Sequence, residues 1–122
     1  MALTGQVPIL KCHSVERSLT FYKDTLGFVE IKSRRANDRL EWVYINSGKT
    51  FLMLELKNET ETKLEAGIRL YFYTDDIDNL YQYMSAKQYA VSQIETTAYL
   101  LKQFSITDPD GYKIQIGETI RK

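Results

Sequence analysis

The same order of predicted elements occurs twice along the 122-residue chain, and this internal duplication is the strongest constraint on its fold. In the first half, an apolar run precedes an amphipathic segment that Ser14 caps and Gly27 ends. Runs with the alternation of strands follow, separated by polar residues. We predict a strand at 7–12, a helix at 15–26, and strands at 28–33, 40–45 and 50–56.

The second half repeats this order after a polar segment at 57–63, which we interpret as a linker. Asp75 is predicted to cap the second helix, with Asp78 three residues later in its first turn. The last two strands are joined by residues 107–111, whose Asp, Pro and Gly are typical of a tight turn. The strands of this half are predicted at 68–73, 89–94, 99–106 and 112–116.

Each half is therefore a βαβββ module, and one such module cannot bury its own sheet well. Two paired modules predict an α+β fold, in which a curved mixed sheet surrounds a cleft and the helices lie outside. We expect one domain over residues 1–122, with module 1 at about 6–58 and module 2 at about 67–118.

Charge and composition exclude several classes of function. The chain has 16 basic and 16 acidic residues, mixed along its length, whereas a nucleic-acid binder would carry a basic face. No apolar run approaches the roughly 18 residues of a membrane span, and no leader pattern precedes the first strand. The single cysteine, Cys12, is compatible with a reducing compartment, so we expect a cytoplasmic protein without nucleic-acid or membrane partners.

Two motifs carry a resemblance to a known family. The segment Ser18-Leu19-Thr20-Phe21-Tyr22-Lys23-Asp24-Thr25-Leu26-Gly27-Phe28 resembles the first helix and turn of the vicinal oxygen chelate superfamily, which includes glyoxalase I, bleomycin-resistance proteins and extradiol dioxygenases. The segment Asp108-Pro109-Asp110-Gly111-Tyr112-Lys113-Ile114 resembles the final turn and strand of that superfamily. With the doubled module between them, the resemblance covers about residues 7–117.

This resemblance implies where a metal would be held. The positions that correspond to the four metal ligands of the family's enzymes are Val7, Glu55, Arg69 and Gln115. One carboxylate remains among the four, valine has no lone pair to donate, and an arginine repels a divalent cation. We therefore expect no metal and no other cofactor.

Without a metal, the chain is similar to the bleomycin-resistance branch of the superfamily, whose members sequester a drug without chemistry. The resemblance then implies antibiotic resistance by small-molecule binding, a homodimer, and a cleft in which aromatic and acidic side chains hold a flat or cationic compound. An alternative is a glyoxalase-type lyase or isomerase that depends on metal or uses Glu55 as a base, in which case Glu55 is the catalytic residue.

Strand alternation predicts which side chains face the cleft, because successive residues point to opposite faces of a sheet. If the leucines at 52, 54 and 56 face the helix, Glu55 faces the other way. For Glu55 a structural ion pair with Arg69 and simple solvent exposure remain alternatives to ligand binding. The predicted ligand-binding residues are Glu55, Arg69, Tyr71, Tyr73, Gln115, Trp42, Tyr44 and Phe51.

Overall fold

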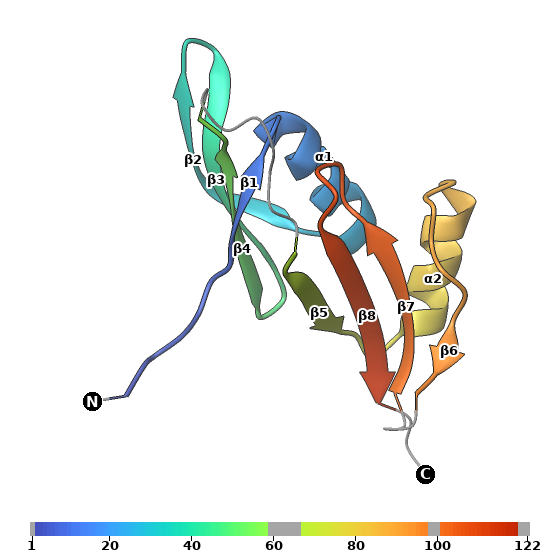
Figure 1. Cartoon of the computed structure of the whole chain (residues 1–122). Helices are drawn as coiled ribbons and strands as arrows, with labels where there is room; N and C mark the ends of the chain where they lie inside the picture. Colours follow the sequence, from blue (N-terminus) through green and yellow to red (C-terminus); the bar gives the residue numbers. More distant parts are fainter. Residues whose placement is uncertain (1, 59–66, 98–100, 120–122) are drawn as a thin grey trace. The chain divides into compact units, whose positions relative to one another are not determined.

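The computed structural model describes residues 2–58, 67–97 and 101–119, which form two compact units (Figure 1). We call the unit Met1–Leu64 module 1 and the unit Glu65–Lys122 module 2. Each module contains one helix and one mixed sheet of four strands. The predicted α+β fold with two βαβββ modules is thereby confirmed, and its strands pair as one sheet per module.

Module 1 is built around a parallel pair of strands that are distant in sequence. Its first strand lies beside its last, and the sheet order is β1-β4-β3-β2. Helix α1 packs against β3 and β4, and the apolar side chains between helix and sheet are almost fully buried, Tyr22, Val43 and Leu54 among them. The elements are β1 (Ile9–Cys12), α1 (Val15–Leu26), β2 (Val29–Ala36), β3 (Arg39–Ser47) and β4 (Thr50–Leu56).

Local hydrogen bonds explain the bounds of α1. The Ser14 hydroxyl accepts a hydrogen bond from the backbone N–H of Arg17 at 3.2 Å, as predicted for an N-cap. Gly27 ends the helix with φ of 69°, in the left-handed region that glycine adopts without steric cost. Glu16 in the first turn accepts from the backbone N–H of Leu40 at 2.8 Å, and this bond lowers the pKa of the Glu16 carboxyl.

The hairpin between β2 and β3 differs from the expectation. The strand predicted at 28–33 continues to Ala36 and the strand predicted at 40–45 begins at Arg39, so most of the polar residues between the two predictions are strand. A two-residue turn at Asn37 and Asp38 joins the strands, with φ of 53° and 61°. Asn and Asp tolerate this left-handed conformation, and such turns match the natural twist of a hairpin. The charged residues of β2 obscured the strand because both faces of this edge strand are exposed.

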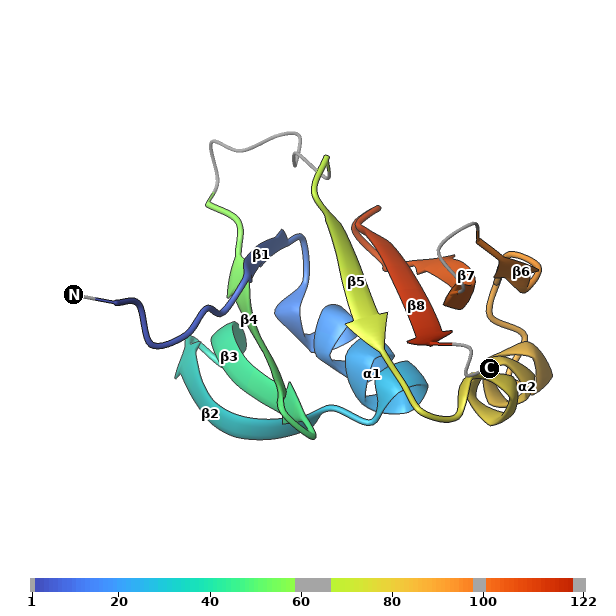
Figure 2. The same ribbon diagram turned by 90° about the horizontal axis from the view of Figure 1, so that it is seen from below.

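Module 2 repeats the topology with the sheet order β5-β8-β7-β6. Strands β5 and β8 pair in parallel, and both ribbon views show β8 between β5 and β7 (Figure 2). Helix α2 packs against β7 and β8, where Phe104 contacts Tyr81 edge-to-face. The elements are β5 (Arg69–Tyr73), α2 (Ile77–Ala86), β6 (Glu95–Thr96), β7 (Leu101–Thr107) and β8 (Lys113–Thr119).

The prediction of a strand at 89–94 is wrong. The structure has there an isolated bridge between Val91 and Ile106, followed by the two-residue strand β6. The Ser92 side chain explains the interruption, because its hydroxyl accepts the backbone N–H of Ser105 at 2.8 Å, in place of a backbone carbonyl. Of the strand predicted at 99–106, residues 99 and 100 lie outside the described residues.

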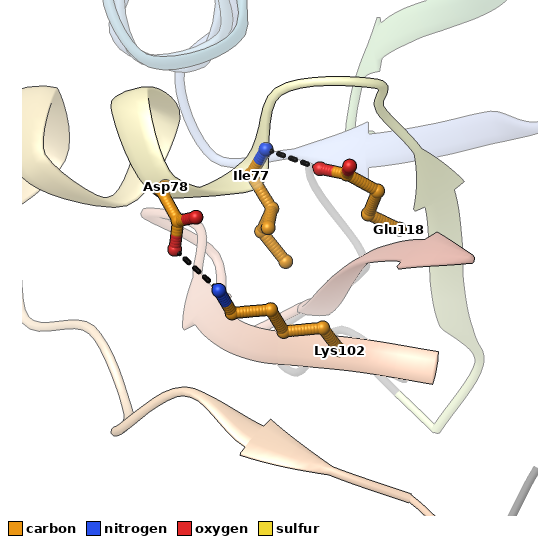
Figure 3. Close-up of polar contacts among 4 residues, drawn as sticks. All are labelled: Ile77, Asp78, Lys102 and Glu118. Atoms are coloured by element: carbon orange, nitrogen blue, oxygen red, sulfur yellow. Dashed lines mark hydrogen bonds and ion pairs between the residues drawn. The ribbon is translucent and has the colours of Figure 1, made fainter. Parts of the chain in front are cut away.

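The start of α2 also corrects the prediction. Asp76 rather than Asp75 is the N-cap residue, and its side chain makes no capping hydrogen bond. Glu118 of β8 caps the helix instead, accepting the backbone N–H of Ile77 at 2.7 Å (Figure 3). A carboxylate at this point also interacts favourably with the positive end of the helix dipole.

We predict that Glu118→Ala lowers the free energy of unfolding by about 1 kcal/mol, because it leaves the first turn of α2 without its acceptor. Asp75→Ala, at the exposed position first predicted as the cap, should change it by less than about 0.5 kcal/mol. Urea denaturation measures both variants. Equal losses in the two would contradict the assignment of Glu118 as the cap.

Candidate functional site

Each sheet has one face covered by its own helix, and we call the opposite face of each sheet its open face. On the open face of module 1 the register places Lys11 beside Glu55, Glu55 beside Trp42, and Trp42 beside Arg34. The next row along the strands contains Ile9, Met53, Tyr44 and Lys32. The expected site residues of this module, namely Trp42, Tyr44, Phe51 and Glu55, thus share one surface.

Three aromatic rings form a stacked row on this surface, and we call them the aromatic ladder. The rings of Trp42 and Tyr44 lie 6.4 Å apart between centroids, with planes 15° apart. Tyr44 and Phe51 are 5.7 Å apart, with planes inclined by 24°. All three side chains remain partly exposed, whereas the aromatic residues on the helix side, such as Tyr22 and Phe28, are buried. The ladder therefore presents aromatic surface that the core does not use.

Glu55 lies at one end of the ladder and forms an ion pair. Its carboxylate is 3.0 Å from Nζ of Lys11, which comes from the adjacent parallel strand. Both side chains are just over one-third exposed, so the pair is half-buried and is screened by solvent. Glu55 therefore has its own cation within module 1, a partner that the sequence reasoning did not identify.

The β2 border of the same face is cationic. Lys32 lies opposite Tyr44, and Arg34 lies opposite Trp42. Arg34 Nε is 3.7 Å from the Glu41 carboxylate, a long contact between an exposed arginine and a partly exposed glutamate. The open face of module 1 thus combines an aromatic centre with charged groups on two sides.

The open face of module 2 holds the other four expected site residues. Arg69 lies beside Lys113, Tyr71 beside Gln115, and Tyr73 beside Gly117. Because paired residues in neighbouring strands point to the same face, these side chains share a surface. The two modules therefore divide the predicted set, with Glu55 and the ladder in one and Arg69, Tyr71, Tyr73 and Gln115 in the other.

A hydrogen-bond chain crosses this second face. The Tyr71 hydroxyl donates to Oε1 of Gln103 at 2.8 Å, and Nε2 of Gln103 donates to Glu95 at 3.2 Å. The Tyr71 ring lies over Gly117, where an added Cβ would come within 2.8 Å of the ring carbon Cζ. Desolvation by burial and the neighbouring Tyr73 raise the pKa of the Tyr71 hydroxyl. Gly117 thus leaves the space through which Tyr71 reaches Gln103.

We predict that Tyr71→Phe lowers the free energy of unfolding by about 1 kcal/mol at neutral pH, through loss of the bond to Gln103. The raised pKa means that the folded state holds the phenolic proton more tightly than the unfolded state. This stabilisation is full below the ordinary pKa of 10.0 and is lost as the pH rises through the folded-state value.

Urea denaturation at a series of pH values should therefore show the difference between wild type and Tyr71→Phe shrinking above about pH 10. The matched control is Tyr83→Phe, whose ring is exposed on α2 and is not among the groups that raise the pKa of Tyr71. A difference that stays constant through that range would contradict the role of the Tyr71 hydroxyl.

The side chains at the positions expected for metal ligands do not fit a divalent cation. The Glu55 carboxylate forms an ion pair with Lys11, the Val7 side chain has no donor atom, and Arg69 carries a positive charge. Across residues 2–58, 67–97 and 101–119, no three His, Cys, Asp or Glu side chains come close enough together to bind a metal. The Gln115 amide by itself is a weak ligand.

We predict that calorimetric titration with Zn²⁺ or Ni²⁺ gives no tight stoichiometric binding, because Lys11 competes for the one carboxylate at these positions. Treatment with EDTA should leave the Tm unchanged. One tightly bound metal ion per chain, lost in Glu55→Gln, would contradict this interpretation of the site.

Sequence reasoning found the aromatic and acidic members of these faces but missed three others. Lys11 was hidden in an apolar run, and the alternation of β1 with Leu10 and Cys12 buried was the signal that could have placed it beside Glu55. Gln103 and Gly117 carry no motif. Their roles follow from the register between β7 and β8, which no motif in the sequence indicates.

Comparison with known proteins identifies the class to which this duplicated fold belongs. Residues 9–116 match the family model described as Glyoxalase/Bleomycin resistance protein/Dioxygenase superfamily. Since the match spans most of the chain, the protein belongs to this superfamily. No curated protein sequence matches it significantly.

Solved structures show the same fold at low sequence identity. A glyoxalase-related enzyme from Clostridium phytofermentans has a TM-score of 0.82 at 15% identity, covering 98% of each chain. TnmS3, an antibiotic binding protein from Streptomyces sp. CB03234, has a TM-score of 0.74 at 21% identity, covering 98% of this chain and 100% of the other. Lactoylglutathione lyase from Agrobacterium tumefaciens has a TM-score of 0.71 at 18% identity, covering 97% of this chain and 96% of the other.

Within the described residues, no helix is long and apolar enough to span a membrane.

Proposed function

We propose that this protein binds a flat small molecule without metal and acts by sequestering it. The observation that carries the proposal is the aromatic ladder of Trp42, Tyr44 and Phe51 on the open face of module 1. Nearly parallel, partly exposed rings offer a surface on which a planar ligand can stack. Each favourable ring pair contributes about 0.5–1.5 kcal/mol beyond the area that it buries.

The rest of the surface supports binding more than catalysis. Met53 lies beside Tyr44 in the register and Ile9 lies beside Met53, so both extend the apolar floor. A catalytic carboxylate base usually sits in an apolar or like-charged environment, whereas Glu55 is over one-third exposed and paired with Lys11. This favours binding over the glyoxalase-type alternative, in which Glu55 would be the base.

The comparisons are compatible with this proposal. One structural neighbour is an antibiotic binding protein and another is a lactoylglutathione lyase, so the superfamily fold serves both kinds of function. A role in antibiotic resistance and the homodimer expected from the resemblance are part of the proposal.

The single tryptophan provides a direct test. In a ¹⁵N-labelled sample, the one indole N–H signal belongs to Trp42, which lies in the ladder. We predict that planar ligands such as 2-naphthamide shift this signal in a saturable way. Tyr44→Ala should weaken binding by about fivefold, through loss of ring stacking.

The matched control is Tyr83→Ala, which removes an exposed aromatic ring from α2 and should leave the affinity unchanged. Phe51→Ala provides a second ladder variant if Tyr44→Ala does not fold. A flat ligand panel that leaves the Trp42 signal unmoved, or equal affinity in the Tyr44 and Tyr83 variants, would refute the proposal.

A further inference from the structure

We infer that the preferred occupant of the aromatic ladder is a planar anion, such as an aromatic carboxylate, rather than a cation. This inference rests on the proposed binding function and specifies the class of ligand. The observations that carry it are the charges on the open faces and the places where the chain uses its carboxylates.

Four of the carboxylates that the structure describes stabilise the scaffold. Glu16 accepts the backbone N–H of Leu40, and Glu118 caps α2. Asp108 accepts two backbone N–H groups of its own turn, at 2.8 and 2.9 Å. Asp78 pairs with Lys102 at 2.7 Å beside α2 (Figure 3). These acidic groups stabilise helix ends, turns and helix–sheet contacts, and they lie away from the open faces.

Positive charge remains on the open face of module 1. The Glu55 charge is balanced by Lys11, and Arg34 has its long contact with Glu41. Lys32 lies opposite Tyr44 and makes no ion pair within the described residues. The uncompensated group next to the middle ring of the ladder is therefore an ammonium.

Module 2 shows the same imbalance independently. Arg69 and Lys113 are paired in the register of β5 and β8, so two cations lie side by side on its open face. Adjacent like charges on a sheet reduce stability. No carboxylate among the described residues of module 2 pairs with either, and Glu95 on that face accepts from Gln103.

The chain as a whole has no net charge, so this positive surplus is local. A planar cation on the ladder would gain ring stacking but would lie beside Lys32. A planar anion would gain the same stacking and an ion pair with the Lys32 ammonium. Because exposed ion pairs are weak, the expected preference is modest, about two- to fivefold.

Three ligands with one ring system separate stacking from charge: 2-naphthoate, neutral 2-naphthamide and cationic 2-naphthylmethylammonium. We expect 2-naphthoate to bind about two- to fivefold more tightly than the amide and the cation to bind most weakly, by calorimetry and by the Trp42 indole signal. Lys32→Gln should remove the advantage of 2-naphthoate while leaving the affinity for the amide unchanged. Lys23→Gln, on exposed α1 surface, should change neither affinity.

The outcomes distinguish this inference from the proposed function. Equal affinities for the three ligands, or tightest binding of the cation, would overturn the anion preference and leave the ladder intact as a binding surface. No Trp42 shift with any of the three would overturn both. An advantage of 2-naphthoate that persists in Lys32→Gln, or at about 1 M salt where charges are screened within about 3 Å, would also overturn the inference. A Trp42 shift that depends on protein concentration instead of ligand would identify a second copy of the chain as the occupant, against the inference.

Discussion

The parallel pairing of the first and last strand in each module is the contact on which the rest of the structure depends. The other neighbouring strands are close in sequence, whereas β1 joins β4 and β5 joins β8 across the length of the module. This closure requires a crossover, which the helix and two strands supply, and it fixes which residues meet. The register brings Lys11 to Glu55 and Arg69 to Lys113. A shift of one residue would turn these side chains toward the helix.

The two modules share a topology but carry different chemistry on their open faces. Module 1 has stacked rings and an ion pair, whereas module 2 has a chain of hydrogen bonds from Tyr71 through Gln103 to Glu95. The helix-facing positions are apolar in both, because each sheet must bury one face. Duplication therefore preserves the packing constraint and leaves the open positions free to differ.

The sequence predicts the structure correctly where a local pattern determines it. The cap at Ser14, the end of α1 at Gly27 and the burial of Leu54 beside Glu55 all depend on nearby residues. The prediction is wrong where a distant residue decides the outcome. Glu118 caps α2 from 41 residues away, so a capping pattern at 75–78 could not reveal it. The Lys11–Glu55 pair likewise depends on a long-range register, although both residues were visible as charges within apolar strands.

The four positions that the resemblance gives for metal ligands hold one arginine and one carboxylate, and these two residues connect the expected absence of a metal with the inferred ligand. Arg69 occupies an expected ligand position, and Lys11 engages the one carboxylate among those positions. A divalent metal and a basic side chain both attract anionic oxygen, but they differ in their effect on a bound molecule. The metal polarises bound oxygen atoms and stabilises charge that develops in a reaction, whereas an exposed ammonium or guanidinium forms a weak and reversible pair. If a basic side chain takes the place of the metal, recognition of an anion is retained and the Lewis acid is lost, as the proposed sequestration without chemistry requires.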